Sequence, residues 1–185
     1  MPAHISAPNS RRKRSVRRRY AQALKTATML DLEIPGWNSL HLRYLVLDVN
    51  GTLTSDGAIL DGVDERLREI RTSLDIRLLS ADTFGRLDAL SAQLHLPATR
   101  LRRGDPEAQQ KERFVQALGA HLVVAIGNGA NDAAMLRSSR LGIAVLGPEG
   151  LATEALGAAD VVTGSIADAL DLLRLPTRLV ATQRR

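Results

Sequence analysis

Four separate segments of this chain carry residue types that are used in phosphoryl transfer. Asp48 and Ser80 each end a short apolar run, and the loop 127–132 (GNGAND) follows a third such run and ends in Asp132. Lys111 lies in register with apolar positions of a helical pattern. A carboxylate can attack phosphorus and form an aspartyl-phosphate, a lysine can neutralise the phosphate, and a second carboxylate can help to hold Mg²⁺. The residue types therefore favour a phosphoryl-transfer site.

These residues can meet only if the apolar runs before them are strands of one sheet. Strands that alternate with helices of about ten residues are typical of a parallel sheet covered on both faces. In such a sheet, ligands bind at the carboxyl ends of the strands, near the point where the strand order reverses. Short apolar runs predict strands at 43–48, 76–80, 98–102, 121–126, 141–146 and 160–163.

Hydrophobic periodicity also predicts the helices between the strands. Alternating patterns predict a hairpin over 30–42 and a smaller one around Asp56-Gly57. Asp82 and Thr83 are interpreted as the cap of the helix that follows them. Apolar residues recur at helical spacing in 63–74, 84–94, 106–119, 133–137 and 166–173, and Pro148 predicts the start of one further helix.

Length and composition limit the class of protein. The 185 residues (20.0 kDa) are enough for one domain, and 44% of them are hydrophobic, as in soluble globular proteins. No apolar run approaches the roughly 20 residues of a membrane-spanning helix. The absence of cysteine excludes disulfides, thiolate metal sites and cysteine nucleophiles. Aromatic residues make up only 3%, which argues against binding of single-stranded nucleic acid by base stacking.

The charge is divided unevenly along the chain. Residues 1–28 contain eight basic residues and no acidic one, so residues 29–185 carry −3 of the net charge of +5. The run 11–19 (RRKRSVRRR) is either a tail for nucleic acid or anionic membrane or a solvated extension without a role of its own. We expect residues 1–28 to be a disordered extension, 29–181 the catalytic domain and 182–185 a tail. No segment resembles a secretory signal, so we expect a cytoplasmic protein.

Four motifs resemble a known superfamily in order and spacing. They are LDVNGTLT (47–54), LLSADTFG (78–85), Lys111 within DPEAQQKERFVQALG, and IGNGANDAAMLRSSRLGIAV (126–145). Together they resemble the motifs of the haloacid dehalogenase (HAD) superfamily. Within it they are most similar to the phosphorylation domain of P-type ATPases and to the small soluble P-type ATPase-like proteins. The resemblance covers residues 29 to about 181, and it implies a Rossmann-like three-layer α/β sandwich with a parallel sheet.

The resemblance also implies a role for each site residue. Asp48 would be the nucleophile, and the main-chain carbonyl of Asn50 would help to bind Mg²⁺. Ser80 would donate a hydrogen bond to the phosphate, Lys111 would neutralise both phosphate and nucleophile, and Asp132 would orient the metal. The expected site comprises catalytic residues Asp48, Asn50, Ser80 and Lys111, phosphate-binding residues Gly51, Thr52, Ser80, Ala81 and Lys111, and metal-binding residues Asp48, Asn50, Asn128 and Asp132.

The sequence departs from the superfamily pattern at two of these positions. Asn50 stands where most superfamily phosphatases have an Asp that acts as general acid and then as base, and an amide cannot shuttle a proton. Asn128 stands where the pattern has a metal-binding Asp. Because carboxylates are the preferred protein ligands of Mg²⁺, this change should weaken metal binding. We therefore expect a site that is assembled but attenuated.

The sequence supports a Mg²⁺-dependent phosphohydrolase that works through an aspartyl-phosphate on Asp48. Only about thirty residues separate the first motif from the second and the second from the third, so we expect no cap domain. The chain also lacks the nucleotide-binding domain and membrane helices of an ion pump. The expected partners are a phosphorylated substrate and further copies of the chain, with nucleic acid only if residues 11–19 are functional. The alternative is a catalytically weak regulatory module that binds phosphate or Mg²⁺.

Overall fold

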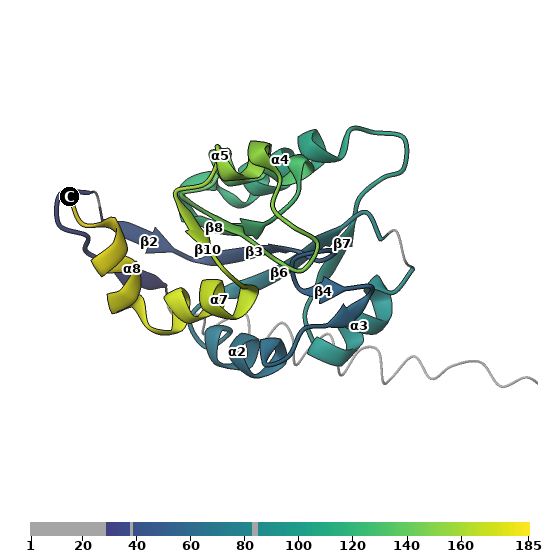
Figure 1. Ribbon diagram of the computed structural model, residues 1–185, viewed down its shortest axis with the longest axis horizontal. Coiled ribbons are helices and arrows are strands. Elements are labelled where there is room, and N and C mark those ends of the chain that lie inside the picture. Colours follow the sequence, from purple (N-terminus) through teal and green to yellow (C-terminus); the bar gives the residue numbers. More distant parts are fainter. Residues whose placement is uncertain (1–28, 38, 83–84) are drawn as a thin grey trace, which may run out of the picture.

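A six-stranded parallel sheet lies at the centre of the molecule. The computed structural model describes residues 29–37, 39–82 and 85–185, and the strand order in its sheet is β10-β9-β8-β3-β6-β7 (Figure 1). This arrangement confirms the parallel α/β sheet that the sequence predicts. The strands are β3 (Tyr44–Asp48), β6 (Asp75–Ser80), β7 (Ala98–Arg100), β8 (Val123–Gly127), β9 (Leu141–Val145) and β10 (Val161–Thr163).

The central strands are buried on both faces. In β3, Leu45 pairs with Val124 of β8 on one side and with Ile76 of β6 on the other. All five residues of β8 and of β9 are buried. A strand between two layers of helices must bury both sets of its alternating side chains, so its sequence reads as a continuous apolar run. This burial explains why these strands were predictable.

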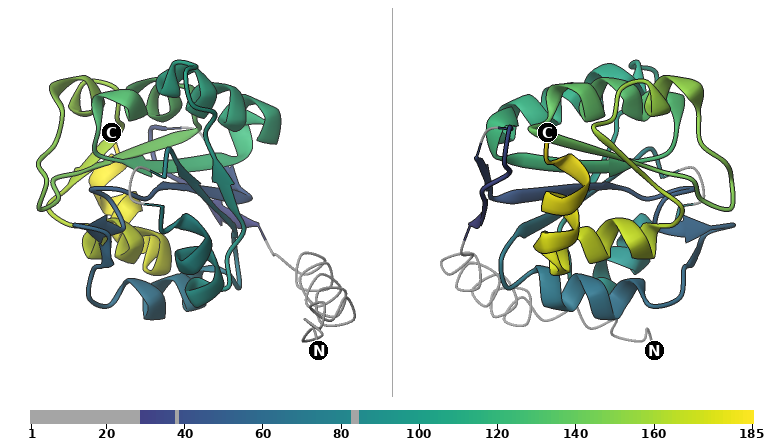
Figure 2. Two further views of the ribbon diagram at one scale, coloured as in Figure 1. Left: turned by 90° about the vertical axis from the view of Figure 1, so that its right-hand side faces the viewer. Right: turned by 60° about the vertical axis from the view of Figure 1, so that its left-hand side comes forward.

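Helices cover both faces of the sheet, as the left-hand view of Figure 2 shows. One apolar core lies between the sheet and the first helical layer and contains Leu47, Leu78 and Leu170. A second core, which contains Val46, Val115 and Met135, lies under the other layer. The first layer holds α2 (Val63–Ile70), α3 (Leu87–Leu94), α7 (Ile166–Arg174) and α8 (Pro176–Gln183), and the second holds α4 (Glu107–Leu118), α5 (Ala133–Ser138) and α6 (Thr153–Leu156).

Two antiparallel hairpins confirm the alternating patterns of the sequence. β1 (Leu30–Leu32) pairs with β2 (Leu40–Leu42) before the chain enters β3. β4 (Thr54–Ser55) pairs with β5 (Ala58–Ile59) just after β3, and we call this second hairpin the flap. The flap lies beside the carboxyl ends of the strands (Figure 1). In the described residues, the connection from β3 to β6 contains the flap and α2, and the connection from β6 to β8 contains α3, β7, α4 and a short 3₁₀ helix, so neither described connection holds a cap domain.

The structure differs from the predicted elements in several places. No helix begins at Pro148; residues 147–150 instead form a turn closed by a bridge between Gly147 and Gly150, and α6 begins at Thr153. The positive φ of Gly150 (93°) is incompatible with a right-handed helix there. α8 was not predicted, and α4 begins at Glu107, one residue later than expected. Two short 3₁₀ helices, Ala120–Leu122 and Ala130–Asp132, precede and follow β8.

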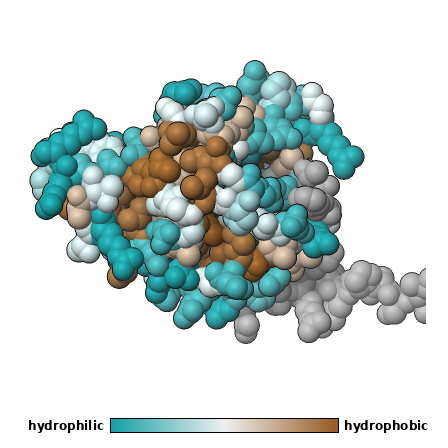
Figure 3. All heavy atoms as spheres, in the orientation of Figure 1, coloured by the Kyte–Doolittle hydropathy of each residue, from teal (hydrophilic) through white to brown (hydrophobic). Residues whose placement is uncertain are grey.

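Several large apolar side chains remain at the surface. Apolar residues gather on the face shown in Figure 3, over β10 and the helices beside it, and the exposed large ones in the described residues include Leu146, Leu156, Val162 and Leu175. Among the helices that the structure describes, none is both long enough and apolar enough to cross a membrane. The basic residues 11–19 and Thr83 lie outside the described residues, so the structure tests neither the predicted extension nor that part of the predicted cap.

Candidate active site

The predicted site residues converge at the carboxyl ends of three neighbouring strands. β3 ends in Asp48, and the adjacent β6 ends in Ser80. β8, on the other side of β3, leads into the loop that ends in Asp132. The chain first builds the sheet outward from β3 through β6 to β7 and then returns to place β8 against β3. The strand order therefore reverses at β3 and β8, which is where ligands bind in open α/β sheets.

Lys111 joins the two carboxylates of the site. Its Nζ lies 2.7 Å from Oδ1 of Asp48 and 2.6 Å from Oδ1 of Asp132. Lys111 is only 1% exposed, and Asp48 and Asp132 are 6% and 0% exposed. Its amine is thus buried between two acids and does not extend to solvent, as the amine of a surface lysine with a packed stem would.

The charges of this triad shift the pKa values of two of its members. Burial and the negative charge of Asp132 raise the pKa of Asp48 from 3.8 to about 7, although Lys111 and Thr52 oppose the rise. Burial lowers the pKa of Lys111, but the two carboxylates outweigh that effect, so its pKa lies above its ordinary value. Lys111 is therefore a permanent cation. Two buried carboxylates share this one positive charge, so ionised Asp48 leaves the site with a net negative charge.

The loop after β8 is shaped around Asp132. The Oδ2 of Asp132 accepts hydrogen bonds from the backbone N–H groups of Asn128 (3.0 Å) and Gly129 (2.9 Å). A side chain at Gly127 would place its Cβ 2.5 Å from Cγ of Asp132. The glycine is therefore required by the close approach of the carboxylate. Both oxygens of Asp132 have partners, because Oδ1 accepts from Lys111.

Both the nitrogen and the oxygen of the Asn128 side-chain amide have polar partners. Its Nδ2 donates to the carbonyl of Gly150 (3.1 Å), and its Oδ1 lies 2.9 Å from the hydroxyl of Thr52. The same hydroxyl lies 3.2 Å from Oδ2 of Asp48. An aspartate at position 128 could not donate to Gly150, so the asparagine is matched to the turn at residues 147–150. The hydroxyl of Thr52 therefore lies between the amide oxygen of Asn128 and the carboxylate of Asp48, the candidate nucleophile.

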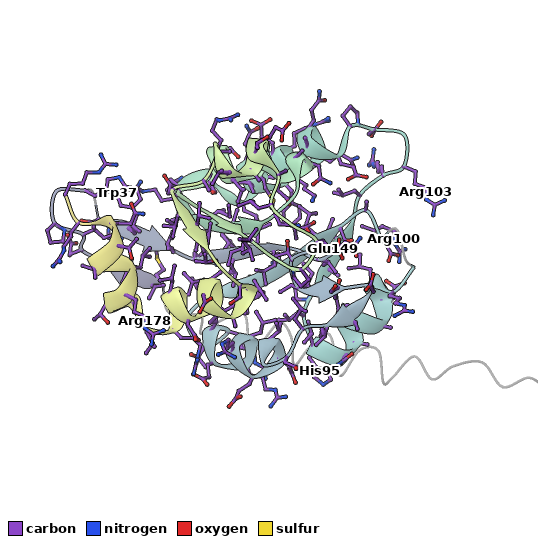
Figure 4. The ribbon with its side chains drawn as sticks, in the orientation of Figure 1. Trp37, His95, Arg100, Arg103, Glu149 and Arg178 are labelled. Atoms are coloured by element: carbon purple, nitrogen blue, oxygen red, sulfur yellow. The ribbon has the colours of Figure 1, made fainter. Side chains whose placement is uncertain are left out.

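Gly51 lies in a close contact between two loops. Its φ of 77° is in the left-handed region. A Cβ on Gly51 would lie 2.9 Å from both Nδ2 of Asn128 and Oε2 of Glu149. Glu149 was not among the predicted site residues, because it lies in the turn where the sequence predicted a helix. Figure 4 shows Glu149 at the same end of the sheet as Arg100, so its carboxylate adds negative charge near the site.

Ser80 and Asn50 face each other across the ends of β6 and β3. The Oγ of Ser80 lies 3.5 Å from Nδ2 of Asn50 and accepts a hydrogen bond from the N–H of Asp82 (2.9 Å). Asn50 therefore offers an amide donor to this side of the site and no proton-transfer group. Ala81, between Ser80 and Asp82, is half-buried.

Asp82 accepts a hydrogen bond from the first turn of the helix that follows it, as the predicted cap would. Its Oδ1 accepts from the N–H of Leu87 (2.9 Å) at the start of α3, and its Oδ2 accepts from Nε of Arg100 (2.8 Å). Burial raises the pKa of Asp82, but these hydrogen bonds and the charge of Arg100 outweigh that effect, so the pKa falls below 3.8. Asp82 is therefore a structural anion whose charge is already balanced.

The oxygen atoms of the site suit a hard divalent cation. The side-chain oxygens of Asp48 and Asn128 both lie beside the hydroxyl of Thr52, and Asp48 and Asp132 share Lys111. The main-chain carbonyl of Asn50 is the further metal ligand that the resemblance implies. The described residues contain no group of three or more His, Cys, Asp or Glu placed to hold a metal. Mg²⁺ commonly takes one or two carboxylates and completes its shell with water and phosphate. The net negative charge beside Lys111 makes this set fit Mg²⁺.

Comparisons with known proteins identify a relative by sequence. No family model matches the chain. The chain is 47% identical over 62 residues to the uncharacterized protein MJ0073 of Methanocaldococcus jannaschii, which covers 34% of this chain and 67% of that protein. It is 49% identical over 39 residues to the uncharacterized protein MJ0072 of the same organism, covering 21% and 89% of the two chains. This chain and MJ0073 belong to one family.

Solved structures identify the fold. A HAD-family hydrolase from Streptomyces avermitilis superposes with a TM-score of 0.57 at 21% identity, covering 71% of this chain and 84% of that one. The 3-deoxy-D-manno-octulosonate 8-phosphate phosphatase of Moraxella catarrhalis, solved with magnesium and phosphate ions, gives 0.57 at 16% identity and covers 88% and 98%. A phosphoserine phosphatase in a phospho-aspartyl analogue form gives 0.56 at 14% identity and covers 70% and 98%. The chain has the HAD fold.

The HAD fold brings together the residues that the sequence selected. Asp48, Asn50, Ser80, Lys111 and Asp132 all lie at one end of the sheet, and Gly51, Thr52, Ala81 and Asn128 lie in the same loops. The structure thus places these residues side by side, and their roles in binding and catalysis stay predictions. Sequence reasoning missed Glu149 and also Arg86, which contacts the flap. Arg86 and its partner Gly57 lie 29 residues apart in the sequence, so no local pattern predicts their contact.

Proposed function

We propose that this protein is a Mg²⁺-dependent phosphohydrolase that works through an aspartyl-phosphate on Asp48. The observation that carries the proposal is the buried Asp48 at the end of β3, hydrogen-bonded to the buried cation Lys111. A carboxylate at this position of the HAD fold faces the place where a phosphate would lie, and a lysine beside it neutralises the charge that the phosphate brings. The phosphatases with the same fold support this reaction class.

The proposed reaction has two steps. A carboxylate oxygen of Asp48 attacks phosphorus, and the bond from phosphorus to the ester oxygen breaks as the new bond forms. The leaving oxygen takes its proton from solvent, because the amide of Asn50 has no acid proton to give. Water then attacks phosphorus, loses a proton to solvent and releases inorganic phosphate, which restores the carboxylate of Asp48.

Other residues of the site bind and orient the phosphate. Lys111 neutralises phosphate oxygens, and the hydroxyl of Ser80 donates to one of them. Gly51, Thr52 and Ala81 complete the proposed phosphate site. The N–H groups of Gly51 and Thr52 donate within their own turn, to the carbonyls of Thr54 (2.9 Å) and Val49 (3.3 Å), so these two residues would contribute the shape of the turn and the hydroxyl of Thr52, and Ala81 would contribute its backbone N–H. Mg²⁺ would be held by Asp48, the carbonyl of Asn50, Asn128 and Asp132, and when bound it would supply positive charge toward the phosphate.

A phosphatase screen tests this proposal. Purified protein is assayed with p-nitrophenyl phosphate and a panel of phosphorylated metabolites, with and without Mg²⁺, against Asp48→Asn as the control. We expect slow hydrolysis that requires Mg²⁺ and is lost in Asp48→Asn. Activity that Asp48→Asn retains would refute the aspartyl-phosphate mechanism.

The second candidate function is a regulatory module that binds phosphate or Mg²⁺ without turnover. The amides at positions 50 and 128 favour it, because neither Asn50 nor Asn128 supplies the carboxylate that an efficient site would use. Calorimetric binding of Mg²⁺ or inorganic phosphate by a protein without turnover would favour this candidate. A cytoplasmic location and self-association also remain part of our proposal, and the exposed apolar residues on β10 and α6 are consistent with contacts between copies.

A further inference from the structure

A second cavity lies at the end of the sheet opposite the candidate active site. Its volume of about 490 Å³ is within the range of small-molecule pockets, and it is open to solvent. Most of its lining comes from the segments that lead into three neighbouring parallel strands. These lining residues are Ala120 and His121 before β8, residues 137–140 before β9, and Ala158 and Asp160 before β10.

The cavity is separate from the candidate active site. The five residues of β8 connect the segment at His121 to the loop 127–132, and five residues of a parallel strand span about 16 Å. Trp37, in the connection between β1 and β2, adds a further wall. Figure 4 shows Trp37 at the opposite end of the molecule from Glu149. A molecule in this cavity therefore contacts none of the residues around Asp48.

Two arginines of the lining have no acidic partner. In the part of the chain that the structure describes, neither Arg137 nor Arg140 forms an ion pair. The guanidinium of Arg140 lies 5.2 Å from the centre of the Trp37 ring, and its Nη2 donates to the carbonyl of Ser39 (3.4 Å). These two contacts orient the guanidinium, which has further N–H groups for a ligand. Arg137 lies in the last turn of α5.

The remaining polar groups of the lining leave it with a net positive charge. Asp160 is the one acid among the described lining residues, and its Oδ2 already accepts from the N–H of Gly142 (2.8 Å). The hydroxyls of Ser138 and Ser139 donate to carbonyls of α5, so they offer no donor to the cavity. Two guanidiniums against one carboxylate favour an anion, and guanidinium groups match the oxygens of a phosphate in pairs.

We propose that this cavity binds a nucleotide whose phosphates pair with Arg137 and Arg140. Inorganic phosphate would fill only a small part of the 490 Å³, so the cavity has room for the organic part of the molecule. The indole of Trp37 and the side chains of Ala120 and Ala158 supply apolar surface for the base beside the two guanidiniums. This site is independent of the proposed function, because it shares no residue with the phosphohydrolase site.

The fluorescence of Trp37 tests the proposal directly. Trp37 is the only tryptophan of the chain, so a change in its emission reports on this cavity. ADP is added to the full-length protein in EDTA at physiological ionic strength, with excitation at a wavelength that adenine does not absorb. We expect a saturable change with ADP, weaker binding of inorganic phosphate, and no change with adenosine, which carries no charge. Adenosine or inorganic phosphate that binds as well as ADP would refute recognition of a nucleotide.

Single arginine variants locate the binding. Arg137→Gln should weaken ADP binding about tenfold, as the loss of a hydrogen bond between charged groups would. Arg140→Gln should do the same and is measured by calorimetry, because Arg140 also contacts the indole. Arg103→Gln is the matched control for the loss of one positive charge, since Arg103 is exposed and lies at the other end of the molecule from Trp37 (Figure 4). Thermal melts check that each variant is folded.

Asp48→Asn distinguishes this cavity from the candidate active site. It should bind ADP with the affinity of the wild type, whether or not the protein hydrolyses any phosphoester. Residues 11–19 are present in every variant, so binding of ADP to that basic run cannot produce a difference between them. An emission that ADP leaves unchanged, full affinity in Arg137→Gln, or loss of ADP binding in Asp48→Asn would overturn the proposal.

Discussion

Replacing Asp48 by asparagine should stabilise the metal-free protein at neutral and alkaline pH. In the folded state, burial and the charge of Asp132 raise the pKa of Asp48 from 3.8 to about 7. The folded protein therefore holds a proton on Asp48 between about pH 4 and pH 7 that the unfolded chain has lost. As the pH rises through this window, the unfolded chain gains free energy by ionising Asp48 and the folded protein does not, so stability falls, and above pH 7 the whole loss is present.

The size of the effect follows from the shift of the pKa. Three pH units at about 1.4 kcal/mol each correspond to a cost of about 4 kcal/mol above pH 7. The opposing attraction of Lys111 is already contained in this net shift, so Asp48→Asn removes the cost without a further correction for that hydrogen bond. We expect a gain of a few kcal/mol, which raises Tm by several degrees for a domain of this size. At pH 4 the gain should vanish.

Thermal melts of both proteins in EDTA, at intervals from pH 4 to pH 9, measure this gain. Asp171→Asn is the control with the opposite sign. Burial raises the pKa of Asp171, but Arg66 and Arg174 outweigh that effect, so its pKa is lowered and its carboxylate stabilises the fold above pH 4. Asp171→Asn should therefore lower Tm at pH 8, and its effect should shrink as the pH falls. A Tm of Asp48→Asn at or below the wild-type value at pH 8 would show that Asp48 is not held at an electrostatic cost.

Four further outcomes follow from the sequence and structure. Asn50→Asp should raise kcat with little change in KM, by up to about 10²-fold, because it supplies the missing acid–base group; unchanged steady-state kinetics would contradict this role. Asn128→Asp should tighten Mg²⁺ binding, and calorimetric titration of both proteins would expose equal affinities if position 128 does not face the metal. Gly142→Ala would place a Cβ 2.6 Å from the backbone carbonyl of Leu136 and should lower Tm by several degrees in a melt, since neither backbone can yield without cost. Removing residues 1–28 should leave Tm unchanged within about 2 °C, because that segment has no apolar pattern with which to join the core.

Most of the sheet was predictable because its signal is local. β3, β8 and β9 are buried on both faces, so each appears in the sequence as an uninterrupted apolar run that ends at a polar residue or a glycine. The site followed from the same rule. Once Asp48 and Ser80 stand at the ends of adjacent parallel strands, the geometry of the sheet brings them together without any further information.

The parts that were missed depend on contacts between distant segments. Pro148 suggested a helix start, but Gly147 approaches the carbonyl of Gly51 so closely that a Cβ there would lie 2.7 Å away. The turn at 147–150 is therefore fixed by the loop after β3, nearly a hundred residues earlier in the chain. Arg86, at the start of α3, likewise donates to the carbonyl of Gly57 in the flap. No local pattern encodes such contacts, so single-sequence reasoning could not find them.

The two amides of the site have different physical consequences, which separates the proposed enzyme from the proposed binding module. Asn128 is fixed by Gly150 on one side and Thr52 on the other, so it keeps an oxygen near Asp48 and reduces only the negative charge available to a metal. Asn50 is held by one long contact to Ser80, and its change of residue type removes proton transfer altogether. Weak metal binding can be overcome by a higher concentration of Mg²⁺, whereas a missing acid cannot be. A substrate whose leaving group needs little protonation does not require the acid that Asn50 fails to supply. Hydrolysis limited to such esters would then mark a slow enzyme, and retained binding without any turnover would mark a binding module.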